Sequence, residues 1–583
     1  MKRYFQYIKP YLPYFILGPV CMLVEVVGEV VMPKLLAQII NVGIPSGDSG
    51  RIVVMGLAMI GMALLMMAGG IGGCYYSTRA AISFGSSLRS DVFGKVQEFS
   101  FANIDKFSTG SLVTRLTNDI TQLQNVISMA LRMGLRAPGM LIGALIMAVM
   151  LNPELALVLA VVIPILGIIL FFIITKGFPR FNILQKKLDA LNSNIQEDLT
   201  NIRVVKSFVR EDFEEEKFGN ANADLRKTSI YAFQVVICMG PVMALAMNIT
   251  TLAVVWFGGK QILVGDMLVG DLTAFTTYIV QILMSLMMTA MLLLQCSRAL
   301  ASAKRINEVL DTVVDLTDEH ATRKDAQVTE GKIEFKNVAF RYYKENQTPV
   351  LSDINLTIEP GKVTGIIGST GSGKTSLVQL IPRLYDADAG SVLVDGVDVK
   401  EYSLKNLREG VGMVLQKNVL FSGSIIDNLR WGDKEASDEE ITKAASYAQA
   451  DTFVRSFKEG YDTTLGQGGV NVSGGQKQRL CIARALLKKP KILILDDSTS
   501  AVDTATDAKI RKAFAEEIPD TTKFIIAQRI SSVQNADRII VMDNGQIHGF
   551  GTHEELLENN EIYREVYETQ TKGGGDFDER AGE

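Results

Sequence analysis

Two acidic residues end a strongly apolar segment in the last part of the chain. Residues 491–495 read KILIL, and Asp496 and Asp497 follow directly. A buried β-strand that ends in an aspartate is a common way to hold Mg²⁺ beside a bound nucleotide. The next position, here Asp497, is where a hydrolase would place the base that prepares water for attack on a phosphate. An aspartate has a shorter reach than a glutamate, so this position raises the question of how fast such a site would act.

A phosphate-binding loop supplies the other half of a nucleotide site. Residues 368–375, GSTGSGKT, fit the pattern G-x-x-x-x-G-K-[ST] and follow the apolar segment KVTGII. The glycines let backbone N–H groups close on the phosphates, Lys374 reaches the β- and γ-oxygens, and the Thr375 hydroxyl ligates Mg²⁺. Asp496 supplies the matching acid for the metal. The loop residues expected to contact nucleotide are Gly368, Ser369, Thr370, Gly371, Ser372, Gly373, Lys374, Thr375 and Ser376.

A second glycine pair opens a helix further along the chain, in NVSGGQKQRLCIARAL (471–486). A helix N-terminus favours anions, yet one nucleotide does not need two phosphate-binding elements. The simplest interpretation is that this element contacts the γ-phosphate held by a second copy of the domain. The sequence therefore predicts a dimer with nucleotide at its interface. The residues assigned to this contact are Ser473, Gly474, Gly475 and Gln476.

The first half of the chain differs from this nucleotide-binding half. The 583 residues are too many for one core, and apolar segments occur near 15–43, 53–76, 131–151, 155–175, 231–257 and 273–295. A bilayer core needs about 20 apolar residues per helix. Six such runs with almost no charge favour membrane spans over buried helices of a soluble core. The net charge of −5 gives no support for nucleic-acid binding.

Basic residues are concentrated in two long segments between the spans. The segments 77–136 and 176–230 carry seven and ten Lys or Arg, whereas the short loops carry only Arg51 and Lys260. The positive-inside rule puts the long segments and both termini in the cytoplasm, for a multi-pass protein of the plasma (inner) membrane. Both segments keep helical character, and some 20 residues would carry a helix roughly 30 Å beyond the membrane. They could act as levers or as solvated hairpins, and periodicity does not choose between the two.

The first span contains two acids, Glu25 and Glu29, in LVEVVGEVVMP. They lie four residues apart, on one helical face. Intramembrane acids usually face a cavity, which would make them a site for a cationic substrate or a proton. A polar pairing with another helix is the alternative, and the sequence leaves the two open.

Taken together, the six spans, the phosphate-binding loop, the VSGGQ segment, the strand ending in Asp496 and the segment SAVD (500–503) resemble a half-size ATP-binding cassette (ABC) exporter. The resemblance covers nearly the whole chain. It implies a multi-domain membrane protein in which a six-helix transmembrane domain, with long cytoplasmic helix extensions, is fused to an α/β P-loop NTPase nucleotide-binding domain. The implied domains are a transmembrane domain at 1–315 with cytoplasmic loops 77–130 and 176–230, an ATP-binding cassette at 316–571, and a disordered tail at 572–583.

The resemblance also implies ATP and Mg²⁺ as cofactors and assigns roles to further residues. Tyr342 would stack on adenine, and Gln416 would join Thr375 and Asp496 around Mg²⁺ while sensing the membrane domain. Short coupling helices near 103–110 and 206–214 would touch the cassettes. Communication across the dimer would fall to Ser500, Ala501, Val502 and Asp503.

The chain departs from the family pattern at three places. The catalytic glutamate is replaced by Asp497, the switch histidine by Gln528, and the loop V-G-E-R-G by LGQGG (465–469). Aspartate withdraws the carboxylate by about 1.3–1.5 Å, and a misplacement of about 1 Å can cost on the order of 100-fold in rate. The Gln528 amide cannot take up a proton at neutral pH. The sequence therefore predicts a site that holds Mg-ATP well and cleaves it slowly.

These departures resemble the degenerate member of a heterodimeric, multidrug-type exporter of lipophilic or amphipathic small molecules. The expected partner is a second half-transporter with an intact catalytic Glu and switch His, whose competent site this chain's Ser473–Gln476 would complete. Membrane lipid would surround the spans, and nucleic acid is not expected. Two alternatives remain: a homodimeric exporter with slow hydrolysis, and an ATP-gated channel or regulatory subunit.

Overall fold

The computed structural model describes residues 2–319, 321–342, 348–497 and 502–573, and the chain forms two compact units. The helical unit comprises Met1–Gln97 and Thr109–Thr312. The α/β unit comprises Glu98–Ser108 and Val313–Glu583. A short piece of the N-terminal half thus belongs to the second unit, and it contains the helix α5 (Phe101–Asp105).

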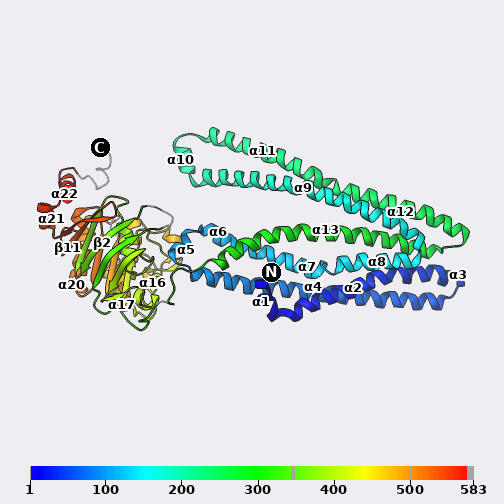
Figure 1. Ribbon diagram of the computed structural model, residues 1–583, viewed down its shortest axis with the longest axis horizontal. Helices are drawn as coiled ribbons and strands as arrows, with labels where there is room; N and C mark the ends of the chain where they lie inside the picture. The colour runs from blue at the N-terminus through cyan, green and yellow to red at the C-terminus, as the bar shows by residue number, and fades with distance from the viewer. Residues whose placement is uncertain (1, 320, 343–347, 498–501, 574–583) are drawn as a thin grey trace. The chain divides into compact units, whose positions relative to one another are not determined.

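The helical unit is built from long helices that run side by side (Figure 1). Two of them are 49 and 48 residues long, which corresponds to roughly 70 Å at 1.5 Å per residue. The helices are α1 (Phe5–Ile8), α2 (Leu12–Gln38), α3 (Ile44–Ser46), α4 (Ser49–Gln97), α6 (Thr109–Thr114), α7 (Ile120–Met133), α8 (Arg136–Leu151), α9 (Pro153–Thr200), α10 (Ile202–Ser207), α11 (Glu211–Ile237), α12 (Met239–Val264) and α13 (Val269–Asp311).

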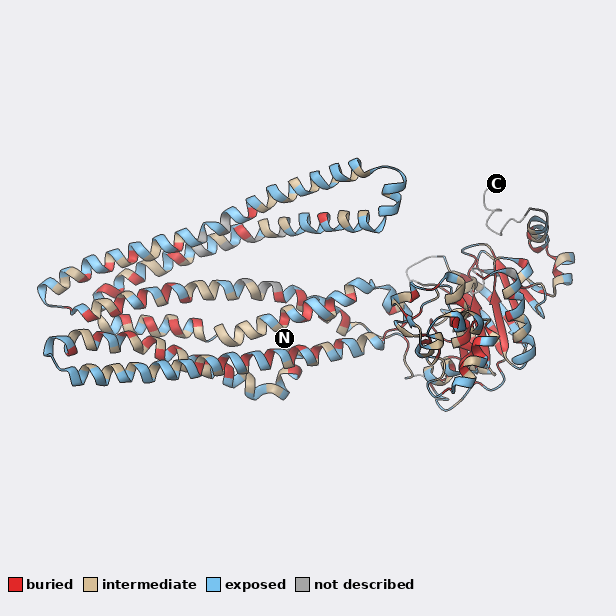
Figure 2. Ribbon diagram, turned by 180° about the vertical axis from the view of Figure 1, so that it is seen from behind, coloured by how far each residue is buried: buried red, intermediate tan, exposed pale blue. Residues whose placement is uncertain are grey.

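Within the described ranges, six helical segments are long and apolar enough to cross a membrane. Their outward faces are apolar as well, since α4 exposes Leu57, Leu64 and Ile71, and exposed residues cover much of the helices in Figure 2. A water-soluble helix would place polar side chains there. This arrangement confirms the predicted six-span domain, and α4 and α9 confirm that spans continue as long helical extensions.

The fifth span differs from its predicted bounds of 231–257. The apolar run is continuous in sequence, but the helix is interrupted at Cys238, so Tyr231–Ile237 belongs to α11 and the spanning segment is Gly240–Val264. Pro241 lies in the first turn of α12. A proline is tolerated there because its missing N–H would have no intrahelical partner.

Small residues allow close packing in the helical unit. Ala144 and Ala148 of α8 are fully buried against a cluster that includes Val26 and Val30 of α2. Small side chains let helix backbones approach each other within a membrane. The Tyr278 hydroxyl of α13 donates to the Val30 carbonyl at 2.9 Å, which adds a polar tie between α13 and α2.

The described part of the α/β unit contains a six-stranded sheet in the order β12-β11-β3-β10-β9-β6, a four-stranded antiparallel sheet in the order β2-β1-β4-β5, and the pair β7-β8. The strands are β1 (Ile333–Phe340), β2 (Leu351–Ile358), β3 (Val363–Gly368), β4 (Ala389–Val394), β5 (Val397–Asp398), β6 (Val411–Val414), β7 (Gly423–Ser424), β8 (Thr464–Leu465), β9 (Ile492–Asp496), β10 (Thr522–Ile526), β11 (Arg538–Asp543) and β12 (Gln546–Gly551).

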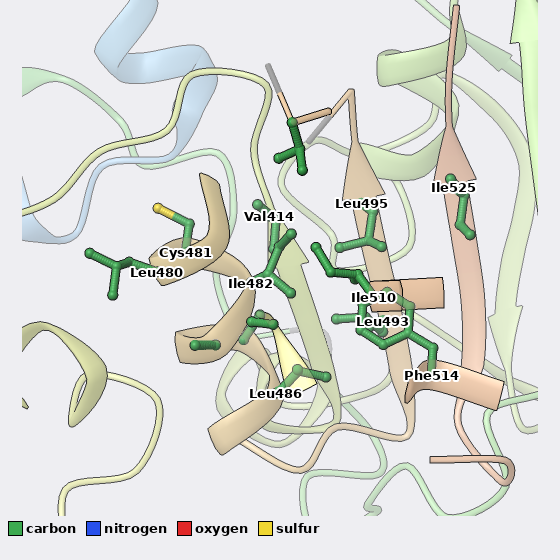
Figure 3. Packing of buried hydrophobic residues seen from close by; sticks show 14 of the residues in the cluster. Val414, Leu480, Cys481, Ile482, Leu486, Leu493, Leu495, Ile510, Phe514 and Ile525 are labelled. Carbon is green, nitrogen blue, oxygen red and sulfur yellow. The ribbon is translucent and has the colours of Figure 1, made fainter. Parts of the chain in front are cut away.

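Helices cover the six-stranded sheet on both faces, and Figure 3 shows the packing on one of these faces. On this face, Leu493 and Leu495 of β9 pack against Ile482, Leu486 and Phe514. The helices of the unit, besides α5, are α14 (Lys374–Gln379), α15 (Leu404–Gly410), α16 (Ile425–Leu429), α17 (Asp438–Tyr447), α18 (Asp451–Ser456), α19 (Gly474–Leu487), α20 (Thr504–Glu517), α21 (His553–Asn559) and α22 (Glu561–Gly573).

Strands β3, β6, β9 and β10 are mutually parallel in the large sheet. Their near-continuous apolar sequences suit strands that are buried on both faces. Because parallel strands end at one edge, the residues that follow them are brought together there, and ligands of such sheets bind outside this edge. The fold therefore gathers the phosphate-binding loop, Gln416, Asp496 and Gln528 at the carboxyl edge of the sheet.

Candidate nucleotide site

The phosphate-binding loop joins β3 to α14 and depends on its glycines. Gly371 and Gly373 have φ angles of 86° and 93°, a region that favours glycine. A Cβ on Gly373 would lie 2.7 Å from the Leu351 side chain, so a larger residue does not fit. Lys374 Nζ donates to the carbonyls of Gly368 and Ser369 at 2.7 Å each. The ammonium therefore lies across the loop, where phosphate oxygens could replace the two carbonyls.

A hydroxyl and a carboxylate meet beside this loop as the expected Mg²⁺ ligands. The Thr375 hydroxyl donates to Asp496 Oδ1 at 2.9 Å. Burial raises the pKa of the Asp496 carboxyl, and the neighbouring charge of Asp497 adds to this effect. Asp496 is only 2% exposed, so a carboxylate here gains from a nearby cation.

The donor set fits a nucleotide-bound Mg²⁺. Across the described residues, no group of three or more His, Cys, Asp or Glu side chains is placed to hold a metal. Mg²⁺ is commonly held by one or two protein ligands, with water and phosphate oxygens completing its shell. The Thr375 and Asp496 oxygens match that requirement. Gln416, the third expected ligand, is exposed just beyond β6.

Asp497 and Gln528, predicted to replace the catalytic Glu and the switch His, contact each other. Asp497 follows β9 and Gln528 follows β10, and the Gln528 side-chain amide donates to Asp497 Oδ2 at 3.3 Å. Asp497 has a φ of 46°, a left-handed conformation that short Asp and Asn side chains tolerate better than longer ones. Its N–H donates to the Ile526 carbonyl at 3.2 Å, which fixes it to the neighbouring strand. The structure thus joins two residues that the sequence analysis considered separately.

Tyr342, expected to stack on adenine, is part of an aromatic cluster at the base of the loop. Its ring packs edge-on against Phe340 and Tyr385, with centroid distances of 4.9 and 5.1 Å. Its hydroxyl forms a 2.8 Å hydrogen bond with Ser376 Oγ of α14, and burial raises the pKa of the Tyr342 phenol. Ser376 therefore supports Tyr342, in addition to its place in the expected nucleotide contact set.

The same aromatic cluster is contacted by α5, the helix that corresponds to the expected coupling helix near 103–110. The Tyr385 hydroxyl donates to Asp105 Oδ2 at 2.9 Å, and the Phe101 and Tyr385 rings lie 6.1 Å apart. The Asn103 side chain donates to the Val313 carbonyl at 3.1 Å. Sequence reasoning missed Tyr385 and Asp105, because the residues lie 280 positions apart.

The second expected coupling helix, near 206–214, corresponds to α10 in the helical unit. It ends a hairpin of α9 and α11 (Figure 1). Phe208 and Val209, directly after α10, are 73% and 81% exposed. This tip therefore presents apolar side chains that the chain itself leaves uncovered.

The VSGGQ segment forms the N-terminus of α19. Ser473 Oγ accepts from the Gln476 N–H at 3.3 Å, and Gln476 Oε1 accepts from the Ser473 N–H at 2.9 Å, which is a capping box. Ser473 and Gly474 are exposed and Gly475 is half-buried. The N-terminal end of α19 is thus exposed on the cassette.

Three further expected segments are 500–503, 465–469 and 572–583, and the first and last of them are described only in part. Ser500 and Ala501 lie outside the described residues, whereas Val502 is buried and Asp503 caps α20 by accepting from the Thr506 N–H at 2.9 Å. This hydrogen bond lowers the pKa of Asp503. In the segment that replaces V-G-E-R-G, Gly468 and Gly469 both have left-handed φ angles, of 69° and 66°. The predicted tail at 572–583 also falls mostly outside the described residues, from 574 onward.

The intramembrane acids pair with a residue that the sequence analysis did not single out. Arg136 Nη2, at the start of α8, lies 3.1 Å from Glu25 Oε1 and 2.7 Å from Glu29 Oε1. Gln281 of α13 donates to the Glu29 carbonyl at 2.9 Å. This geometry matches the alternative of polar pairing between helices. The signal available in the sequence was Arg136 itself, a basic residue at the start of an apolar span.

Comparison with known proteins agrees with this architecture. Residues 15–286 match the family model described as the ABC transporter transmembrane region, and residues 351–500 match the ABC transporter model. The chain is 40% identical to the uncharacterized ABC transporter ATP-binding protein YfiB of Bacillus subtilis, over 98% of both chains. It is 31% identical to the ATP-dependent lipid A-core flippase of Syntrophus aciditrophicus, over 98% of this chain and 94% of the flippase.

A solved structure of a bacterial Atm1-family ABC exporter with ATP bound has the same fold. It has a TM-score of 0.80 and 23% identity, and it covers 97% of this chain and 99% of its own. The family couples ATP hydrolysis to transport, and the six apolar segments make this chain a multi-pass membrane protein. The chain therefore belongs to the ABC transporter family, as a half-size exporter subunit with a transmembrane region fused to an ATP-binding cassette.

Proposed function

We propose that this chain is the degenerate subunit of a heterodimeric exporter that moves lipophilic or amphipathic compounds out of the cell. Its own nucleotide site binds Mg-ATP and hydrolyses it slowly, and its Ser473–Gln476 segment completes a faster site on the partner. The observation that carries this proposal is the contact between Asp497 and Gln528 at the carboxyl edge of the sheet. We place the protein in the plasma (inner) membrane, with both termini and the cassette in the cytoplasm.

Binding requires only groups that the chain retains. Lys374 lies across the loop, where phosphates would lie, and the Thr375 and Asp496 oxygens form the metal half of the site. Tyr342 supplies an aromatic surface beside α14 for the base. Bound Mg²⁺ would offset the negative charge of the triphosphate oxygens. The proposed contact residues at this end of the site are those of the loop 368–376 with Tyr342, Gln416 and Asp496.

Slow hydrolysis follows from two effects on the same carboxylate. Asp497 is one methylene shorter than glutamate, so its oxygens are withdrawn by about 1.3–1.5 Å. One of those oxygens also accepts a hydrogen bond from the Gln528 amide, so it is already occupied where a catalytic base would bind water. A histidine at 528 could exchange a proton near neutral pH, whereas an amide cannot. Both changes act on the one residue that would activate water.

Two exposed features support an assembly of two chains. The tip after α10 presents Phe208 and Val209 to solvent, and the cassette exposes a stacked pair, Phe421 and Trp431, whose ring centroids are 4.2 Å apart. An apolar surface of this kind is typical of an interaction site. The exposed N-terminus of α19 adds a polar contact for the partner's nucleotide. We propose that the partner is a second half-transporter with an intact catalytic Glu and switch His.

The substrate class is proposed from the membrane-embedded half of the chain and from one relative. The 31% identical protein of Syntrophus aciditrophicus is described as a lipid A-core flippase, which favours an amphipathic substrate that moves within the bilayer. Two alternatives are distinguishable by experiment. A homodimer with slow hydrolysis would transport without a partner, and an ATP-gated channel would allow only downhill movement.

The decisive experiment measures ATPase activity and uphill transport in vesicles containing this chain alone or with a half-transporter that carries Glu and His. We expect the chain alone to be a weak ATPase and the mixture to be active. Restoring both residues, Asp497→Glu with Gln528→His, should raise hydrolysis by the chain alone by roughly 100-fold. The matched control is Gln534→His, the same exchange six residues further along. Fast hydrolysis by the unmodified chain alone that disappears in Asp497→Asn would contradict the proposal.

A further inference from the structure

We propose that Gln570, on the C-terminal helix α22, is a positioning residue that holds the segment 528–532 in place at the nucleotide site. We call this segment the switch segment. The kinetic part of the inference rests on the proposed function, whereas the structural part does not. The inference extends the site beyond the motifs recognised in the sequence, to a helix near the end of the chain.

Both ends of the Gln570 side-chain amide bind the backbone of the switch segment. Its Nε2 donates to the Gln528 carbonyl at 3.0 Å, and its Oε1 accepts from the Ile530 N–H at 2.9 Å. These two backbone groups flank Arg529. The amide thus replaces the hydrogen bonds that a neighbouring strand would make. It satisfies the Ile530 N–H and the Gln528 carbonyl, which lie beyond the end of β10.

The switch segment needs such a partner because strand pairing ends just before it. Strand β10 ends at Ile526, and the Ala527 N–H makes one more bond, of 3.1 Å, to the Ile366 carbonyl of β3. A single 3₁₀ turn, Ile530–Ser532, follows. Between Ala527 and Ile530, the Gln528 side chain extends toward Asp497. The direction of that side chain therefore depends on a backbone position that Gln570 fixes.

Helix α22 is itself anchored firmly enough to act as a support. Tyr563 and Val566 are buried on the face that carries Gln570, at spacings of seven and four residues, which place all three on one side of a helix. The Tyr563 hydroxyl lies 2.7 Å from His553 Nδ1 of α21. Ile530 belongs to the same buried cluster as Tyr563. Apolar packing thus fixes the distance between α22 and the switch segment, and the Gln570 amide fixes the alignment.

The chain of contacts links the C-terminal helix to the reacting end of the site. Gln570 holds the Gln528 backbone, and the Gln528 side chain binds Asp497. Both bonds of the Gln570 amide go to the backbone of the switch segment, so we expect its effect to pass through Gln528. Removing it should loosen the switch segment and change the rate of hydrolysis, while nucleotide binding by Lys374 and Thr375 should stay the same.

Hydrogen–deuterium exchange of the full-length chain in nanodiscs, without nucleotide, tests the structural part. In Gln570→Ala the peptide spanning 527–533 should exchange at least about fivefold faster, the effect of losing a hydrogen bond of ordinary strength. Gln570→Glu keeps an acceptor for the Ile530 N–H but has no donor for the Gln528 carbonyl. Its exchange rate should therefore lie between those of the unmodified chain and Gln570→Ala. The control is Thr571→Ala, whose hydroxyl bonds only within α22, to the Tyr567 carbonyl. Equal exchange in Gln570→Ala and Thr571→Ala, with unchanged thermal midpoints, would overturn the inference.

Kinetics in the restored background, Asp497→Glu with Gln528→His, test the consequence for catalysis. Adding Gln570→Ala should lower kcat by roughly tenfold with little change in KM, and Gln570→Glu should recover part of the loss. If exchange rises but kcat does not fall, the positioning role of Gln570 is supported and the proposed catalytic role of residue 528 is wrong. If neither changes, the positioning role of Gln570 is wrong, whatever the fate of the proposed function.

Discussion

The side-chain amide of Gln528 donates a 3.3 Å hydrogen bond to Oδ2 of Asp497. In the sequence these residues are 31 positions apart, in two different motifs, and each is predicted to depart from the family pattern. In the fold they lie just beyond the ends of two adjacent parallel strands, β9 and β10. A change at one position alters the surroundings of the other, so the pair is expected to act as one functional element.

A double-mutant cycle tests this coupling. We expect the double variant to lower the activation free energy of hydrolysis by about 1–2 kcal/mol more than the sum of the effects of Asp497→Glu and Gln528→His alone. In Asp497→Glu alone, the Gln528 amide would still bind the new carboxylate. In Gln528→His alone, the carboxylate of Asp497 would still be too short. ATPase rates of the four variants, purified without a partner, give the coupling. Additive effects would show that the two departures are independent.

Nucleotide binding should depend on Lys374. Its ammonium is held by the carbonyls of Gly368 and Ser369 and is available to phosphate oxygens. Lys374→Ala should weaken binding of a fluorescent ATP analogue by about 100-fold, because a charge-assisted contact in a partly buried site is lost. Lys362→Ala, which removes a surface lysine paired with Asp537 at 3.0 Å, should leave binding unchanged. Equal affinities of the two variants would exclude Lys374 from the site.

The Tyr385 hydroxyl should transmit contact between α5 and the phosphate-binding loop. Tyr385→Phe removes the 2.9 Å bond to Asp105 and keeps the ring against Tyr342. In the two-chain complex, we expect stimulation of ATPase by substrate to fall roughly fivefold, as for loss of a hydrogen bond to a carboxylate, with basal ATPase retained. Tyr461→Phe removes a similar 2.7 Å bond, to Asp451, elsewhere in the α/β unit. It should have no such effect, and an equal loss in both variants would point to stability instead of coupling.

The Arg136 cluster should stabilise the helical unit. Arg136→Met leaves the partly buried Glu25 and Glu29 without their cation, and breaking such an ion pair on one side costs up to about 3 kcal/mol. We expect a clear drop in the thermal midpoint of the chain in nanodiscs, with recovery when Glu25→Gln and Glu29→Gln are added. Arg132→Met, one turn earlier, removes a contact to the Ser128 carbonyl within its own helix and is the control. A stable Arg136→Met protein would show that the acids are paired otherwise, for example with a cationic substrate.

Lys523 should make the α/β unit less stable near neutral pH. It is 1% exposed in the centre of the sheet, and burial lowers its pKa to about 8, from 10.5. A lysine with a depressed pKa in the folded state binds protons more strongly when unfolded, so stability should rise as pH increases from about 8 toward 10. Lys523→Met should be more stable at pH 7 by about 3 kcal/mol and should remove this rise. Thermal unfolding at pH 7 and pH 9 checks both points, and an unchanged pH dependence would show that the amine keeps its ordinary pKa.

The sequence by itself determined the features that depend on local chemistry. A phosphate-binding loop needs its glycines and its lysine within eight residues, and a membrane span needs about 20 apolar residues in a row. Both requirements are met inside one short window, so the six spans and the cassette could be predicted without a partner segment. The predicted fifth span near 231–257 and the apolar helical segment Gly240–Val264 differ at their starts, because apolar composition does not reveal the helix interruption at Cys238.

The tertiary structure decided the contacts between distant residues. The order of the parallel strands brought Asp497 to Gln528, and the packing of α22 brought Gln570 to the same segment. The pairing of Glu29 with Arg136 likewise joins residues 107 positions apart. Hydrophobicity and backbone preference act along the chain, so they can be read from a sequence. Hydrogen bonds and ion pairs act over about 3 Å in space, and only the fold places such groups that close.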